Sequence, residues 1–230
     1  AKHFKVNRKG EDIFCYELGN PNGKLIFLVH GWESNVGCLS NFAFALEKDY
    51  RIIGFNIPAH ADSEEKYTNM YEGKEAFKLV LNYINPTKSF SVISHSFGSA
   101  MTGYALSEVT YKADKLVFLT SMNELEQVFF DFQKMIGFND KIYKHLKQIA
   151  DDILGENLSN IKVADKLKNA KYDELLIIHD TKDKMIPYSN AVEIHENVLN
   201  SKLITHTKIG HYRMLWNNQV LEETLSFLKS

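Results

Sequence analysis

The sequence predicts an α/β protein whose mainly parallel central sheet is flanked by helices. Its apolar runs have the length of strands and are continuous, as in Leu25–Val29, which is typical of strands buried on both faces. Stretches with apolar side chains at helical spacing lie between these runs, and this alternation indicates right-handed βαβ units. With 230 residues, of which 44% are hydrophobic, the chain can form one such domain, or a domain with a small insert.

Eight strands are expected in order along the chain. They are His3–Asn7, Ile13–Leu18, Leu25–Val29, Arg51–Asn56, Phe90–Ile93, Lys115–Leu119, Leu175–Ile178 and Lys202–Thr205. The polar Arg8–Asp12 segment predicts the turn that joins the first two. Apolar stripes predict helices within Ala76–Ile84, Ala191–Val198 and Leu215–Leu228.

Residues 124–167 interrupt this alternation, because they contain no strand-like run. They predict two or three short helices rich in large apolar side chains. One interpretation is a second core under ordinary helices. We favour a small helical cap of residues 124–167 over the carboxyl edge of the sheet, where open α/β sheets bind ligands. Residues 1–123 and 168–230 would then form the core domain.

Composition argues against several other classes of protein. The chain has 27 basic and 29 acidic residues without a basic block, so it carries no electrostatic signature of nucleic-acid binding. Its apolar runs are too short to span a membrane, and we recognise no signal peptide, which favours the cytoplasm. The two cysteines, Cys15 and Cys38, have no metal-ligand spacing, and no phosphate-binding loop is present. We therefore expect neither a metal nor a cofactor.

A short segment, Ser94-His95-Ser96-Phe97-Gly98, lies between a predicted strand and a helix-like stretch. Small residues at its first, third and fifth positions allow a strand and a helix to pass close together. Such a sharp turn would hold Ser96 in a strained conformation with its hydroxyl clear of the sheet. The helix that follows would favour negative charge developing near that hydroxyl.

Three more motifs follow predicted strands. His30-Gly31-Trp32 comes directly after the third strand. His179-Asp180-Thr181-Lys182-Asp183 follows the seventh strand and continues to Pro187, and Gly210-His211 follows the last strand. Carboxyl ends of parallel strands meet at one edge of a sheet, so these residues are expected to gather there.

With these motifs in this order, nearly the whole chain resembles the α/β-hydrolase superfamily. Ser94 stands where the Gly-x-Ser-x-Gly pattern of that family usually begins with glycine. The Asn56–Ser63 segment resembles the family's Asp-x-Pro-Gly-x-Gly-x-Ser only in part. Asn56 replaces Asp, and Ala59 and Ala61 replace two glycines. Alanine reaches positive φ less easily than glycine, so we expect a somewhat different loop.

The resemblance implies a role for each motif. Ser96 would be the nucleophile, His211 the general base and Asp183 the acid that orients it. The backbone N–H groups of Trp32 and Phe97 would form the oxyanion hole. Asp180 and Glu124 remain alternatives for the acid, since each also follows a predicted strand.

These residues predict a serine hydrolase that cleaves small to medium apolar carboxylic esters through an acyl-enzyme on Ser96. Its small-molecule substrate would lie in an apolar pocket. The pocket residues expected from the sequence are Trp32, Phe129, Phe132, Met135 and Phe138. A thioesterase, a C–C bond hydrolase and a ligand-binding protein with negligible turnover remain alternatives, because each can use the same fold.

Overall fold

The computed structural model describes residues 1–8, 10–63 and 65–230, while the side chains of Phe132 and Met135 lie outside that description. The expected Arg8–Asp12 turn includes Lys9, which is also outside it. Within these described residues, eight strands form one sheet in the order β1-β2-β4-β3-β5-β6-β7-β8. The α/β class with a mainly parallel sheet is therefore confirmed.

Each strand expected from the sequence overlaps one observed strand. The strands are β1 (Lys2–Arg8), β2 (Glu11–Gly19), β3 (Lys24–Val29), β4 (Tyr50–Phe55), β5 (Phe90–His95), β6 (Ala113–Leu119), β7 (Tyr172–Asp180) and β8 (Ser201–His206). β2 pairs antiparallel with both β1 and β4, whereas the pairs from β4 through β3 to β8 are parallel. The carboxyl ends of the parallel strands consequently share one edge.

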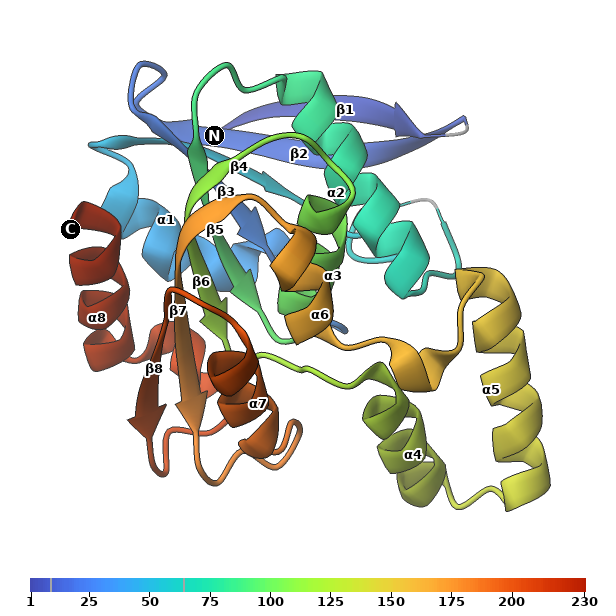
Figure 1. Cartoon of the computed structure of the whole chain (residues 1–230). Coiled ribbons are helices and arrows are strands. Elements are labelled where there is room, and N and C mark those ends of the chain that lie inside the picture. The colour runs from blue at the N-terminus through green and yellow to red at the C-terminus, as the bar shows by residue number, and fades with distance from the viewer. Residues whose placement is uncertain (9, 64) are drawn as a thin grey trace.

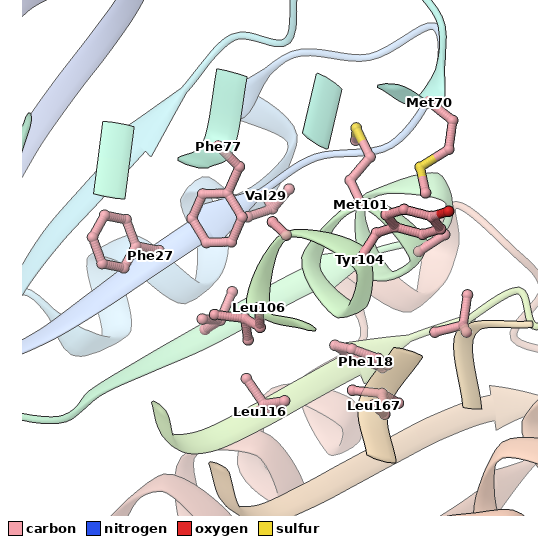
Figure 2. Packing of buried hydrophobic residues seen from close by; sticks show 14 of the residues in the cluster. Phe27, Val29, Met70, Phe77, Met101, Tyr104, Leu106, Leu116, Phe118 and Leu167 are labelled. Carbon is pink, nitrogen blue, oxygen red and sulfur yellow. The ribbon is translucent and has the colours of Figure 1, made fainter. Parts of the chain in front are cut away.

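Helices cover both faces of the sheet (Figure 1). One face carries α2 (Met70–Ile84), α3 (Phe97–Ser107), α6 (Val163–Asn169) and α7 (Ser189–Asn197), and the other carries α1 (Ser40–Leu46) and α8 (Asn218–Lys229). Figure 2 shows the larger core on the first face, where Phe27 of β3 meets the rings of Phe77 and Phe90 edge-on at 5.6 and 5.2 Å. Burial of this apolar surface is the main stabilising term for the fold.

The apolar stripe expected as one carboxyl-terminal helix, Leu215–Leu228, is divided in the structure. A short 3₁₀ helix, η3 (Arg213–Trp216), precedes α8. The side chain of Asn217 accepts hydrogen bonds from two N–H groups in the first turn of α8, at 2.9 and 3.1 Å. Asparagine is a favoured helix N-cap, so α8 begins after it.

The segment after β6 leaves the layered body and returns to it. α4 (Leu125–Ile136) and α5 (Asp140–Leu154) lie outside the two helical layers in Figure 1, and η2 (Leu158–Asn160) leads back to α6. Glu124 and Lys162 form an antiparallel bridge and an ion pair of 2.6 Å where this segment leaves and rejoins the body. α6 packs against α3 and extends past residue 167, where the sequence predicts the end of the cap. None of the helices within the described ranges combines the length and the apolar character needed to cross a membrane.

Candidate active site

Ser96 lies at the corner between β5 and α3, with backbone angles of φ 56° and ψ −126°. Positive φ is uncommon for a residue with a side chain and persists only where neighbours enforce it. Here the Ser96 N–H donates to the Leu119 carbonyl at 2.8 Å. The Ser96 carbonyl accepts from the N–H and the hydroxyl of Ser99, at 2.9 and 2.6 Å. These hydrogen bonds hold the strained turn that the sequence predicts.

Two glycines let β3 and α3 approach each other at this corner. A Cβ atom placed on Gly98 would lie 2.5 Å from the carbonyl oxygens of both Val29 and His30. A Cβ atom on Gly31 would lie 2.9 Å from the Ser96 Cβ atom. The turn after β3 is therefore in direct contact with Ser96 and the first turn of α3.

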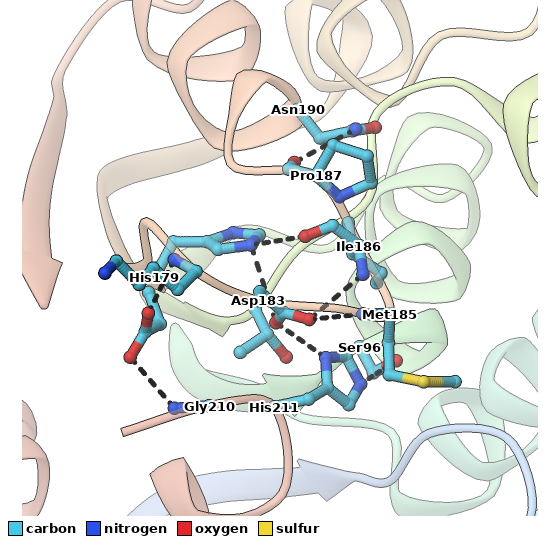
Figure 3. Close-up of polar contacts among 12 residues, drawn as sticks. Ser96, His179, Asp183, Met185, Ile186, Pro187, Asn190, Gly210 and His211 are labelled. Carbon is cyan, nitrogen blue, oxygen red and sulfur yellow. Dashed lines mark hydrogen bonds and ion pairs between the residues drawn. The ribbon is translucent and has the colours of Figure 1, made fainter. Parts of the chain in front are cut away.

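His211 joins Ser96 to Asp183 (Figure 3). Its Nε2 atom lies 2.9 Å from Ser96 Oγ, and its Nδ1 atom lies 2.8 Å from Asp183 Oδ2. A carboxylate only accepts hydrogen bonds, so Nδ1–H donates to Asp183 and Nε2 is free to accept from the serine hydroxyl. The three side chains follow β5, β7 and β8 and meet at the carboxyl edge of the sheet.

The Asp183 carboxylate is held in its charged form. Its side chain is fully buried, which opposes ionisation, but His211 and the N–H groups of Ile186 and Met185 donate hydrogen bonds to it. These contacts outweigh burial and lower the pKa of Asp183 below its ordinary value of 3.8. Near neutral pH, Asp183 therefore carries a negative charge that can stabilise a protonated His211.

The other two acid candidates are engaged elsewhere. Asp180 accepts hydrogen bonds from the N–H groups of Lys182, Ile209 and Gly210, and so fixes the loops after β7 and β8. Glu124 pairs with Lys162 at 2.6 Å. Neither carboxylate contacts His211 within the described residues, so the geometry favours Asp183 over both.

Two histidines brace the turn after β3. His30 donates through Nδ1 to the Gly31 carbonyl at 2.8 Å and accepts from the Ile57 N–H through Nε2 at 3.0 Å. His60 accepts from the Glu33 N–H through Nε2 at 3.1 Å. The Asn56–Ser63 loop thus supports the turn that carries Trp32, although among the described residues it forms no hydrogen bond with Ser96.

Ala59 and Ala61 adopt φ angles of 62° and 50° in this loop. From the sequence we expected a loop of somewhat different shape, because alanine reaches positive φ less easily than glycine. Both residues occupy the left-handed region that glycine reaches easily, and each does so at a cost in backbone strain.

The fold matches many solved structures at low sequence identity. An esterase from Exiguobacterium antarcticum aligns with a TM-score of 0.75 and 18% identity over 99% of each chain. Bromoperoxidase from Bacillus anthracis aligns with a TM-score of 0.75 and 17% identity over 100% of this chain and 99% of that one. Mouse α/β hydrolase domain-containing protein 10 aligns with a TM-score of 0.72 and 12% identity over 100% and 97%. This chain has the α/β-hydrolase fold. A scan against protein-family models and a search of curated proteins found no match.

The α/β-hydrolase fold of this chain brings Trp32 and Phe97 together beside Ser96. Their rings meet edge-on at 5.3 Å, and Trp32 is 43% exposed. Phe97 is the first residue of α3, and N–H groups in the first turn of a helix have no acceptor within that helix. The backbone of this corner can therefore offer donors to an oxygen atom near Ser96.

The pocket expected from α4 is only partly visible. Phe129 is half-buried against the larger core, and Phe138 is half-buried just beyond the end of α4. The side chains of Phe132 and Met135 lie outside the described part of the structure. This part of the pocket therefore stays a prediction.

Two residues beside the site were missed by sequence reasoning. Met185 is 55% exposed, and Figure 3 shows its side chain extending past Ser96 and His211. Tyr212 is half exposed, and its ring lies edge-on to His211 at 5.0 Å. Both lie within two residues of a predicted site residue, and that proximity was the available signal. Within the described residues, no group of three His, Cys, Asp or Glu side chains is placed to hold a metal ion.

Ser94 also finds a structural explanation. Its fully buried hydroxyl lies 2.7 Å from the Thr102 hydroxyl, so it joins β5 to α3. The α/β-hydrolase pattern usually has glycine at this position, and serine adds a hydroxyl group. That hydroxyl is hydrogen-bonded to Thr102 of α3 rather than directed at His211.

Proposed function

We propose that this protein is a serine hydrolase that cleaves small to medium apolar carboxylic esters through an acyl-enzyme on Ser96. The observation that carries the proposal is the position of His211, within 2.9 Å of Ser96 Oγ and 2.8 Å of Asp183 Oδ2. The esterase from Exiguobacterium antarcticum and Est1E from Butyrivibrio proteoclasticus, solved with ferulic acid bound, have the same fold and support ester bonds as the substrate class.

In the first half of the reaction, Ser96 Oγ attacks the ester carbonyl carbon while its proton passes to His211 Nε2. The Asp183 charge stabilises the resulting imidazolium through Nδ1–H. His211 then gives the proton to the departing alkoxide oxygen, and the acyl group remains on Ser96. In the second half, water loses a proton to His211 as its oxygen attacks the acyl carbonyl carbon, and His211 returns that proton to Ser96 Oγ as the bond from Ser96 to the acyl group breaks and the acid leaves.

Charge on the carbonyl oxygen would be stabilised by the backbone N–H groups of Trp32 and Phe97. One such donor stabilises the transition state by roughly 3 kcal/mol. Gly98 and Gly31 support this assignment, because the close approach that they permit places both backbone segments beside Ser96. The amino end of α3 adds a favourable dipole.

We further propose that α4 and α5 form a cap over the substrate. The bridge between Glu124 and Lys162 marks its two ends, and Figure 1 shows both helices on the side toward which β5 and β6 run. Trp32, with Phe129, Phe132, Met135 and Phe138 of the cap, would supply apolar contacts for the acyl or alcohol group.

The test is hydrolysis of p-nitrophenyl esters from acetate to octanoate by wild type and Ser96→Ala, from about pH 5 to 9. We expect Ser96→Ala to lose activity by about 10⁴-fold or more. A fluorophosphonate should label Ser96 once per chain in the wild type, as read by mass spectrometry of the modified peptide.

Ser94→Ala is the matched control, because the Ser94 hydroxyl contacts Thr102 and not His211. It should keep its label and its activity within about tenfold of wild type. Equal and feeble rates in wild type and Ser96→Ala on oxygen esters, thioesters and C–C substrates would refute the proposal. One-time acylation without turnover would instead favour a ligand-binding protein.

A further inference from the structure

His95 sits next to the nucleophile, yet its side chain is directed at the loop that carries the base. Its Nε2 atom lies 3.2 Å from the carbonyl oxygen of His211, and the two rings are 4.9 Å apart between centroids. We propose that His95 is a positioning residue, which holds the backbone of His211 so that its ring reaches both Ser96 and Asp183. This inference rests on the function proposed above.

The tautomer of His95 follows from its partner. A carbonyl oxygen only accepts hydrogen bonds, so the proton must be on Nε2. The ring is 1% exposed, and its Nδ1 atom is buried with no partner among the described residues. Burial lowers the pKa of His95 to about 3, so the ring stays neutral when His211 takes a proton. An unsatisfied nitrogen in the core costs free energy, so among the described residues the only hydrogen bond that offsets burial of this ring is the one from Nε2.

The hydrogen bond from His95 Nε2 holds the His211 carbonyl group in place. In residues 1–8, 10–63 and 65–230, no second donor reaches that oxygen. The preceding residue, Gly210, has φ 81°, a conformation that glycine adopts without strain. Without the hydrogen bond from His95, the backbone between Gly210 and η3 would be held less firmly. This is the segment that must orient the His211 ring toward Ser96 and Asp183.

The His95 ring also separates two loops of the site. On its Nδ1 side lies Gly31, where an added Cβ atom would approach Nδ1 to 3.3 Å. On its Nε2 side lie His211 and Tyr212, the latter with its ring 6.3 Å away. The same ring therefore sets the spacing between the turn that offers oxyanion donors and the loop that carries the base. A small displacement there changes the geometry of proton transfer and costs rate rather than substrate binding.

The test uses three substitutions of His95 that differ in where they place a donor. In His95→Gln the side-chain amide nitrogen can take the place of Nε2, in His95→Asn the shorter side chain places it near Nδ1, and His95→Leu has no donor. We expect His95→Leu and His95→Asn to lower kcat by about 10- to 100-fold with KM changed less than threefold. His95→Gln should keep kcat within about threefold of wild type. The rate of labelling by a fluorophosphonate should follow the same order.

His206→Leu is the control for loss of a buried histidine, because His206 pairs with Glu223 away from Ser96. It should change the melting temperature and leave kcat within about threefold of wild type. If His95→Leu does not fold, the comparison of His95→Gln with His95→Asn decides, with the melting temperature of each measured alongside.

Equal kcat in His95→Gln and His95→Asn, or full kcat in His95→Leu, would overturn the positioning role. The proposed function fails by a different result, namely equal rates in wild type and Ser96→Ala, with the fluorophosphonate label unchanged in Ser96→Ala. The two failures can therefore be told apart in one set of assays.

Discussion

The close approach of β3 and α3 predicts that Gly98→Ala damages both stability and activity. The new Cβ atom would lie 2.5 Å from the carbonyl oxygens of Val29 and His30, about 0.8 Å closer than the roughly 3.3 Å at which carbon and oxygen usually meet. Both contacts are with backbone, so neither can be relieved by a side-chain rotation. Overpacking of this kind costs about 3 kcal/mol, which corresponds to a melting temperature lower by about 6–12 °C in a chain of this size.

Gly103→Ala is the matched control in the same helix. Its Cβ atom would lie 3.0 Å from Val163 Cγ1, a side-chain atom that can move, and alanine favours the helix by about 1 kcal/mol over glycine. We expect its melting temperature within about 3 °C of wild type. Thermal unfolding followed by circular dichroism, together with p-nitrophenyl ester hydrolysis, measures both variants. A Gly98→Ala protein that melts with wild type and keeps full kcat would refute the argument from close approach.

Three further predictions concern backbone strain at Ala59 and Ala61, the acid Asp183 and the buried His95. Ala59→Gly and Ala61→Gly should each raise the free energy of unfolding by about 0.5–1 kcal/mol, because glycine adopts positive φ without strain. The midpoint of urea unfolding tests this, and a lowered midpoint would contradict it. Asp183→Asn should lower kcat by about 10³- to 10⁴-fold with little change in KM, and steady-state kinetics that show a loss under tenfold would argue for another acid. Because burial lowers the folded-state pKa of His95 to about 3, the unfolded chain binds an extra proton below about pH 6.5, and stability should fall as the pH falls from there. In urea titrations between about pH 4 and 6, the free energy of unfolding should change less steeply with pH in His95→Gln than in wild type, by about 1.4 kcal/mol per pH unit. An unchanged pH dependence would exclude a neutral, buried His95.

The inner strands of the sheet, β3 to β7, could be predicted from the sequence because most of their residues are buried on both faces. Continuous apolar runs such as Leu175–Ile178 are rare outside that environment, and each run overlaps an observed strand. The proximity of Ser96, Asp183 and His211 was also predictable, because each follows a parallel strand and the sheet gathers those ends at one edge.

Features that depend on long-range contacts were beyond the sequence. The bond from His95 to the His211 carbonyl joins residues 116 positions apart, and nothing in the local pattern signals it. α6 belongs to the layered body only because it packs on α3, so its apolar side chains alone could not separate it from α4 and α5. The break at Asn217 was readable in principle as an N-cap, but the continuous apolar stripe around it indicated one helix.

The bridge between Glu124 and Lys162 has a consequence for how this architecture can be varied. The chain leaves the sheet and its helical layers at Glu124 and rejoins them at Lys162, and these two residues lie side by side. The segment between them is therefore a loop whose two ends are already held together. The entropic cost of such a loop depends only weakly on its length. A shorter, longer or differently shaped α4–α5 hairpin could therefore be grafted between these two residues without altering the register of any strand, provided that the core contacts of Leu125, Leu158 and Ile161 are kept.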